Sequence, residues 1–152
     1  MKKYFHIFII IPFLILGCDY SPIYSNKNDY NFYIEKLELT GDAEINNLID
    51  KKLKKYSKAE KEKKFSIKST SSYKKISQSK NLSGKTTNYL ISIKVTFQIK
   101  KANITRTFSS TEEFLIKNFN NKFEEKNLEK IKIDNSIDLI INKLIIELSQ
   151  MQ

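Results

Sequence analysis

Cys18 is the residue of this chain with the most distinctive side-chain chemistry, since it is the only cysteine among 152 residues. It follows Gly17 and an apolar run from Phe5 to Leu16 that is interrupted only by His6, and two lysines precede that run. A helix that crosses a membrane needs about 20 apolar residues. The run is therefore too short to span, and it predicts a secretory signal peptide over residues 1–17.

The four residues Ile15-Leu16-Gly17-Cys18 resemble the lipobox of bacterial lipoproteins, although Ile15 stands where leucine is commoner. In such proteins the peptide is cut before the cysteine, and the thiol takes a diacylglycerol whose acyl chains include palmitate. Two or more chains make a stable membrane anchor. The alternative is an ordinary signal peptide followed by a free thiol, from which an exported protein gains little. We expect Cys18 to be lipidated.

Removal of residues 1–17 takes away His6, the only histidine, and lipidation uses the only thiol. Histidine-dependent triads, cysteine nucleophiles and His/Cys zinc sites are then excluded. Glu112-Glu113 and Glu124-Glu125 are adjacent pairs whose side chains diverge, so we interpret them as solvated surface. Three scattered glycines make no phosphate-binding loop. The sequence predicts a protein that is not an enzyme, with no catalytic residue, metal site or cofactor.

The mature chain of 135 residues fits one domain. It keeps 25 basic and 17 acidic residues, a net charge of +8. Such a charge favours nucleic acid, acidic lipid headgroups or an acidic protein surface as partners. Export separates the chain from nucleic acid, which we exclude. Compositional bias is an equal alternative explanation of the charge, because the chain is crowded with Lys, Asn and Ile and has a single arginine, Arg106.

Residues 18–31 are polar and contain Pro22, which predicts a lipidated tether ahead of a single domain over residues 32–152. Residues 32–39 have strand composition, and their alternation slips between Ile34 and Leu37, which predicts a bulge. Asp42 can cap a helix that runs to about Ser57. Its apolar stripe recurs every three or four residues: Ile45, Leu48, Ile49, Leu53 and Tyr56.

Three further strands are predicted over residues 63–79, 86–100 and 104–118. In the first, Phe65, Ile67 and Tyr73 share a face, and Ile76 marks a change of phase. In the second, odd-numbered apolar residues alternate with mainly polar ones from residue 89 to 100, which indicates a sheet with one buried face. The turn at Ser83-Gly84 makes these two strands a long antiparallel hairpin. The third strand has Ile104, Phe108, Phe114 and Ile116 in phase.

Residues 120–152 contain neither Gly nor Pro, and Asn120 or Asn121 can cap a long helix there. The residues predicted to form its apolar side are Leu128, Ile131, Ile137, Ile140, Ile141, Leu144 and Leu148. In the order β-α-β-β-β-α, both helices can cover one face of a four-stranded sheet. We expect an α+β two-layer sandwich.

The order and spacing of several segments resemble the LptE family of lipopolysaccharide-assembly lipoproteins. They are the lipobox, the tether sequence SPIYS, the helix start GDAEINNLI, the hairpin LSGKTTNYLISIKVTF and the C-terminal helix SIDLIINKLIIEL. The resemblance implies an outer-membrane lipoprotein, anchored on the periplasmic side, that plugs the LptD β-barrel and supports its assembly. It also implies contact with lipopolysaccharide on its way to the outer leaflet.

In that family, basic residues around the central hairpin turn are implicated in lipid binding. Leu82 stands at the position of a family arginine, so the role can pass only to Lys80 or Lys85; simple solvation is the alternative for both. Asp19 leaves inner-membrane retention open, because in some bacteria an aspartate after the lipidated cysteine has that effect.

Two other hypotheses stand beside the barrel partner. One is a free-standing periplasmic carrier that binds an acidic lipid between its apolar faces, where an ordinary core is the simpler interpretation of those faces. The other is a structural lipoprotein without a ligand.

Overall fold

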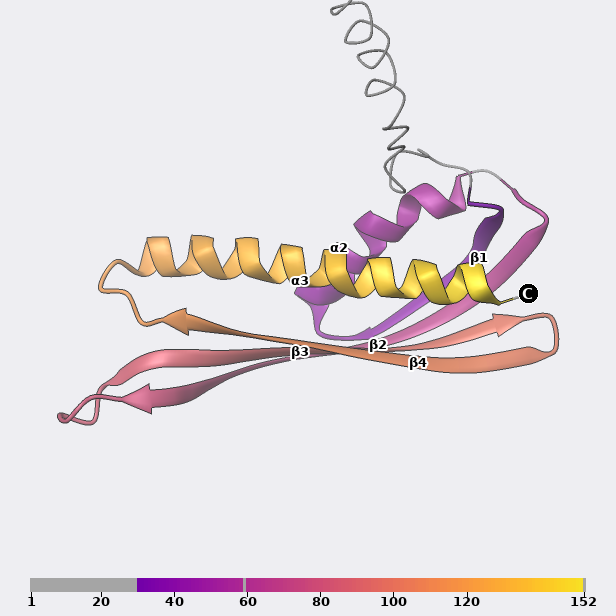
Figure 1. Ribbon diagram of the computed structural model, residues 1–152. Helices are drawn as coiled ribbons and strands as arrows, with labels where there is room; N and C mark the ends of the chain where they lie inside the picture. The colour runs from indigo at the N-terminus through magenta and orange to yellow at the C-terminus, as the bar shows by residue number, and fades with distance from the viewer. Residues whose placement is uncertain (1–29, 59, 152) are drawn as a thin grey trace, which may run out of the picture.

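The computed structural model describes residues 30–58 and 60–151, which form one four-stranded sheet and two helices in the predicted order. The strands are β1 (Phe32–Gly41), β2 (Lys63–Lys80), β3 (Thr86–Lys101) and β4 (Ile104–Lys117). The helices are α2 (Ala43–Leu53), continued by the 3₁₀ turn η2 (Lys54–Ser57), and α3 (Lys122–Gln150). Both helices lie on the same face of the sheet (Figure 1), so the predicted α+β fold is confirmed.

The strand order in the sheet is β1-β2-β3-β4. β1 runs parallel to β2 because α2 and η2 carry the chain back along the sheet, while β2, β3 and β4 are joined by antiparallel hairpins. The register between β1 and β2 shifts between Ile34 and Lys36, which leaves Glu35 as an extra residue. The predicted bulge is confirmed at that position.

The start of α2 is fixed by the two residues that precede it. Gly41 has φ 102°, and a Cβ there would lie 1.9 Å from the carbonyl oxygen of Ser71, so only glycine fits. The next residue, Asp42, accepts a 3.0 Å hydrogen bond from the backbone N–H of Ile45, as an N-cap should. The predicted helix end at Ser57 is also confirmed, with η2 as the last turn.

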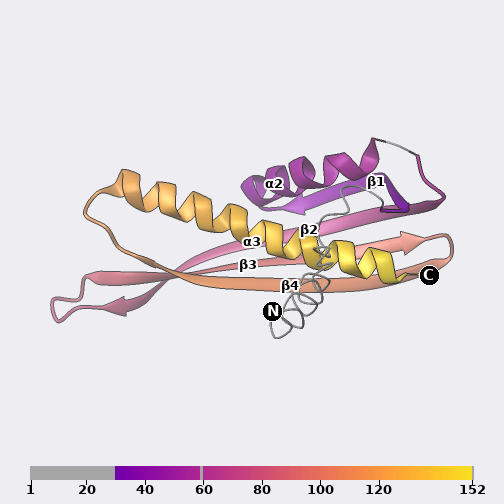
Figure 2. The ribbon, with the colours of Figure 1, turned by 45° about the horizontal axis from the view of Figure 1, so that its top comes forward.

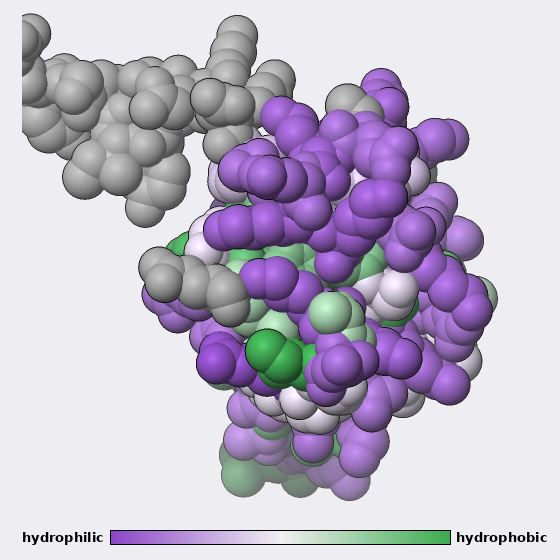
Figure 3. Space-filling view, turned by 90° about the vertical axis from the view of Figure 1, so that its right-hand side faces the viewer, coloured by the Kyte–Doolittle hydropathy of each residue, from purple (hydrophilic) through white to green (hydrophobic). Residues whose placement is uncertain are grey.

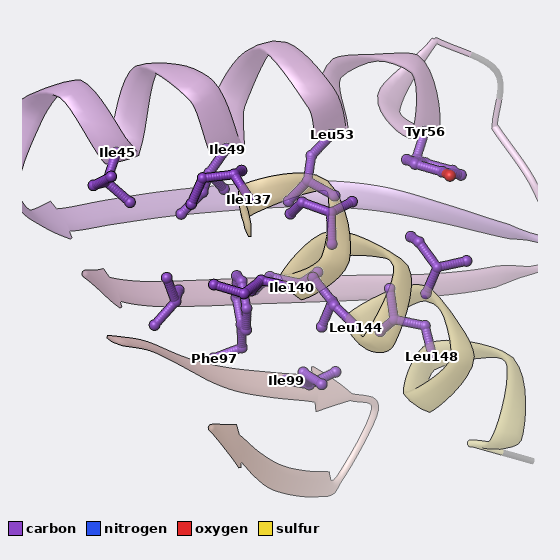
Figure 4. Close-up of a cluster of buried hydrophobic side chains, with 14 of the residues drawn as sticks. Ile45, Ile49, Leu53, Tyr56, Phe97, Ile99, Ile137, Ile140, Leu144 and Leu148 are labelled. Carbon is purple, nitrogen blue, oxygen red and sulfur yellow. The ribbon is translucent and has the colours of Figure 1, made fainter. Parts of the chain in front are cut away.

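The core lies between the helices and the inner face of the sheet (Figure 4). Ile45, Ile49 and Leu53 of α2 are buried there, where α2 contacts α3, β1 and β2, and the odd-numbered residues of β3 from Ile91 to Ile99 are all at most 1% exposed. Tyr30, predicted as part of the tether, packs its ring 5.3 Å from that of Tyr56. Residue 30 thus contacts the domain.

The buried side of α3 differs from the prediction at its first half. Ile137, Ile140, Ile141, Leu144 and Leu148 are buried as expected, but Ile131 is 58% exposed and Leu128 is only half-buried. Ile131 lies six residues before Ile137, which places it about 120° around the helix from it. Ile133, four residues before Ile137, takes the buried position instead.

The hairpin of β2 and β3 is longer than the layer that covers it. Pairing with β1 ends at Ser71, so residues 72–94, here named the hairpin arm, have no β1 strand beside them. The turn of this arm projects past the first turn of α3 in both ribbon views (Figure 1, Figure 2). β1 begins at the opposite end of the sheet, where Phe32 pairs with Lys63.

Hydrophilic residues cover most of the end of the molecule that lies at the right of Figure 1 (Figure 3). None of the described helices combines the length and the apolar character needed to cross a bilayer.

Candidate functional site

Of the predicted site residues, Cys18 and its neighbour Asp19 lie outside the described residues. Lys80 and Lys85 flank the turn of the hairpin arm, where both are exposed. Leu82, between them, is also fully exposed. In the described part of the chain neither lysine has an acidic partner. The structure therefore brings the two predicted lysines to one tip of the molecule with their charges open to solvent.

Asn81 organises the turn between these lysines. Its backbone N–H donates to the carbonyl oxygen of Lys85 at 2.9 Å, and its carbonyl accepts from the N–H of Gly84 at 2.9 Å. Its side-chain oxygen accepts from the N–H of Lys85, also at 2.9 Å. Gly84 has φ 77°, which a glycine adopts without strain. The bonds fix the backbone at the base of the tip.

Hydroxyl and amide side chains join the two strands of the arm near its tip. Ser79 and Thr87 share a 2.8 Å hydrogen bond, and the amide of Asn88 donates to the Ser79 hydroxyl at 2.9 Å. The side-chain amide of Asn118, just after β4, donates to the carbonyl oxygen of Thr86 at 2.7 Å. The first two bonds join the strands of the arm to each other, and the bond from Asn118 joins the arm to the end of β4.

A polar cluster attaches the inner face of the arm to the start of α3. Lys75 donates to Glu129 at 2.6 Å and to Glu125 at 3.4 Å, and Tyr73 donates to Glu129. The Lys75 ammonium also lies 4.7 Å from the ring centroid of Tyr89. These contacts place the first turns of α3 over β2 and β3 of the arm.

Glu125 is the most enclosed carboxylate of this cluster, with its side chain 8% exposed. One oxygen accepts from Lys122 at 2.8 Å and from the backbone N–H of Phe119 at 3.0 Å. The hydrogen bond from Lys122 is the main reason why the pKa of Glu125 lies below the ordinary value of 4.5, although burial opposes it. The carboxylate is thus held ionised.

Two partners of this cluster have raised pKa values. Burial lowers the pKa of Lys75, but hydrogen bonds and charges from Glu129 and Glu125 outweigh it and raise the pKa overall. Burial is the main cause of the raised pKa of Tyr73, and the Glu129 carboxylate adds to it. The raised pKa values keep the charge of Lys75 and the phenol proton of Tyr73 near neutral pH.

The prediction that both glutamate pairs are solvated surface is wrong for one member of each. Glu125 is buried, and Glu112 is half-buried and accepts a 2.6 Å bond from Lys143 of α3. In each pair the other member, Glu113 or Glu124, is exposed. The two side chains of each pair diverge as expected, but the tertiary fold brings a lysine to the glutamate that faces inward. Glu112 and Glu125 each form ion pairs with lysines. Neither glutamate pair brings its two carboxyl groups together as a general acid and a general base.

The outer face of the sheet, which is the face without helices, carries a feature that the sequence analysis missed. Cross-strand pairing aligns Ile76 of β2 with Leu90 of β3, and Leu90 with Leu115 of β4. Ile76 is 53% exposed and Leu115 54%. These three residues, here named the apolar row, lie side by side on an otherwise polar face. The signal in the sequence was an apolar residue at an outward position in each of three strands.

No metal-binding chemistry is indicated in residues 30–58 and 60–151, where no group of three His, Cys, Asp or Glu side chains gathers. The arm instead has two kinds of surface, which are the apolar row and the basic tip formed by Lys80 and Lys85. Lysines can contact anionic groups, and an exposed apolar row can contact hydrocarbon or another apolar surface.

Comparison with known proteins gives matches at the level of structure. No family model matches the sequence, and no curated protein matches it. The crystal structure of rare lipoprotein B from Shewanella oneidensis matches with a TM-score of 0.53 at 14% identity, over 72% of this chain and 92% of that chain. This chain shares that fold.

The solution structure of uncharacterized lipoprotein B from Nitrosomonas europaea is similar as well. It matches with a TM-score of 0.51 at 12% identity, over 82% of this chain and 91% of that chain. The alignments cover most of both solved structures. The structural neighbours of this chain are therefore lipoproteins whose domain has this fold over nearly its whole length.

Proposed function

We propose that this protein is an outer-membrane lipoprotein of the LptE type that plugs an LptD-type β-barrel and assists lipopolysaccharide transport to the outer leaflet. The observation that carries the proposal is the fold shared with rare lipoprotein B, which is of the LptE type. The lipobox-like sequence at Cys18 and the order of the sequence segments support it independently.

The physical character of the surface agrees with such a role. A large barrel leaves a lumen that needs a folded filler with a mostly polar surface. The end of the domain seen in Figure 3 is largely hydrophilic, and the tip of the arm is basic. Phosphorylated glycolipid is anionic, so it would be attracted to lysines such as Lys80 and Lys85.

The packing of the inner faces favours this function over the free-standing lipid carrier. The carrier needs an apolar pocket between the sheet and the helices. In the described residues these faces pack against each other instead, and Phe97, Ile137 and Leu144 are 0% exposed. The described apolar side chains thus fill the position that an acyl chain would occupy.

Co-purification after mild detergent extraction tests the proposed function. We expect the full-length protein to recover a β-barrel partner from membranes, and depletion of the protein to lower the amount of that barrel. Recovery of bound lipid without any barrel would favour the carrier, and recovery of neither would favour a structural lipoprotein.

A further inference from the structure

The outer face of the sheet is a second candidate interaction surface, separate from the tip of the hairpin arm. Both described helices lie on the other face, so neither of them covers it (Figure 1). Alternation along the strands places one polar row after another on it, such as Thr70-Thr96-Ser109 and Ser72-Lys94-Thr111. The apolar row of Ile76, Leu90 and Leu115 interrupts this pattern within the arm.

Charge on the outer face has one predominant sign. Its lysines include Lys68, Lys74, Lys94, Lys100 and Lys117, whereas its carboxylates include Glu38, which pairs with Lys68, and Glu113. Lys74 precedes the apolar row on β2, and Lys117 follows it on β4. The apolar row is flanked on one side by Lys74, Ser92 and Glu113 and on the other by Asn88 and Lys117, so two lysines and one carboxylate border it. Apolar side chains with net positive charge around them suit a surface with anionic groups above hydrocarbon.

The outward side of α3 makes a useful contrast, because it also exposes apolar residues. Leu139 is 52% exposed and Ile146 56%, values that match those of Ile76 and Leu115. Their charged neighbours are already paired, since Asp134 and Asp138 contact Lys52 at 2.9 and 2.8 Å and Lys143 contacts Glu112 at 2.6 Å. Lys74 and Lys117, in contrast, have no acidic partner in the described part of the chain, so an anionic surface would be attracted more strongly to the outer face of the sheet.

We propose that the outer face of the hairpin arm docks on the surface of an anionic lipid bilayer, with the apolar row entering the interface and Lys74 and Lys117 contacting phosphates. This proposal goes beyond the barrel partnership and concerns the protein outside a barrel, because an arm enclosed in a barrel lumen would not face a bilayer. If Cys18 carries the anchor, the 12 residues to Tyr30 span at most about 43 Å when extended. That length allows the arm to reach the membrane that holds the anchor.

The absence of tryptophan from the chain permits a direct test. A single Trp is introduced in the full-length protein, either as Ile76→Trp in the apolar row or as Leu139→Trp on α3. Each variant is reconstituted into phosphatidylcholine vesicles, with and without phosphatidylglycerol, that contain brominated lipids as quenchers. We expect strong quenching for Ile76→Trp only with phosphatidylglycerol present, and little for Leu139→Trp. Equal quenching at the two positions would overturn the proposal.

Charge reversal tests the lysines in the Ile76→Trp background. A lysine near an anionic surface contributes about fivefold to binding, so the loss of two such lysines corresponds to about 25-fold weaker binding. Lys74→Glu with Lys117→Glu should therefore weaken binding to the anionic vesicles by at least about that factor, which lowers the quenching. The matched control is Lys51→Glu with Lys130→Glu, which changes the net charge equally on the helix layer. The proposal fails if the control lowers quenching as much, or if quenching is independent of phosphatidylglycerol.

Replacement of the apolar row gives a third, separate readout. In the full-length protein with Ser72→Trp as the reporter on the outer face, Ile76→Ser with Leu115→Ser should lower quenching several-fold. Leu139→Ser with Ile146→Ser removes equally exposed side chains from α3 and should leave quenching unchanged. The reverse result would place the membrane contact on α3. Barrel recovery is measured on its own, so failure of this proposal and failure of the proposed function are distinguishable.

Discussion

At the residue scale, Glu125 shows how neighbours give one carboxylate a structural task. It belongs to an adjacent glutamate pair at the start of α3, yet it is buried and accepts bonds from Lys75, Lys122 and the N–H of Phe119. A carboxylate that accepts several bonds in its charged form has a lowered pKa. Because α3 is held to the arm through this group, its ionisation contributes to the stability of the fold.

The pKa of Glu125 predicts how stability depends on pH. The folded pKa lies below the ordinary value of 4.5, so the contribution is complete above that value and is lost as pH falls through the folded pKa. We expect Glu125→Gln to lower the free energy of unfolding at neutral pH and to reduce its decrease in acid. Denaturant titrations at neutral and acidic pH measure both effects. An unchanged acid dependence, with Glu124→Gln as the control, would contradict the assignment.

Cys18 is the residue on which the membrane anchor depends. Replacement of Cys18 with Ser should leave the precursor unprocessed by the lipoprotein pathway and without acyl chains, since the hydroxyl cannot take the place of the modified thiol. Mass spectrometry of the mature N-terminus decides the matter in the wild-type protein and the variant. Cleavage at another position with a free Cys18 in the wild-type protein would refute lipidation.

At the scale of elements, β3 contributes side chains to both faces of the sheet. Its odd-numbered side chains form the centre of the core, and its even-numbered side chains lie on the outer face between those of β2 and β4. Alternation of period two produces both surfaces from one strand. A substitution in β3 thus affects the core if the residue number is odd and the outer face if it is even.

This division predicts a large difference between neighbouring substitutions. Ile93→Asp places an uncompensated charge in the core, where Ile93 is 0% exposed, and should cost roughly 3 to 5 kcal/mol of unfolding free energy. Val95→Asp should behave alike, whereas Lys94→Asp should change the free energy by less than about 1 kcal/mol. Chemical denaturation of the full-length protein measures these values. Equal losses of unfolding free energy at residues 93 and 94 would contradict the assignment of Ile93 to the core and of Lys94 to the outer face.

At the scale of the whole molecule, the basic tip and the bulk of the domain serve different parts of the proposed function. Lys80 and Lys85 lie at one end of a long sheet, so they account for a small part of the surface that a barrel lumen would contact. Interfaces that hold proteins together bury far more area than one turn supplies. Lipid contact and barrel contact should therefore be separable by mutation.

The prediction is that Lys80→Glu with Lys85→Glu weakens lipopolysaccharide binding to the purified protein, most strongly at low salt where charges are least screened. Barrel co-purification from cells should persist. Lys51→Glu with Lys130→Glu serves as the control of equal charge and should leave lipid binding nearly unchanged. If the tip variant bound lipid like the wild type, the two lysines would lose their assigned role.

The helices and strands of this fold could be predicted from the sequence, because their signals are local. Alternation, helical spacing, the Asp42 and Asn121 caps and the Ser83-Gly84 turn each act within a few residues, and they placed every strand and helix close to its observed bounds. The bulge near Ile34 was predicted for the same reason. The tip lysines were located because they adjoin a recognisable turn.

Features that depend on contacts between distant segments could not be predicted from local patterns. No local pattern defines the register between strands, so it was not predicted that Ile76, Leu90 and Leu115 form one row, nor that β1 pairs with β2 in parallel. Burial of Glu125 required Lys75 to approach from a strand 50 residues away in the chain. Ile131 is exposed because it lies about 120° around α3 from the buried Ile137, on a side of the helix that the core does not cover. Register and helix placement are set by the packing of the whole core, which no local pattern specifies.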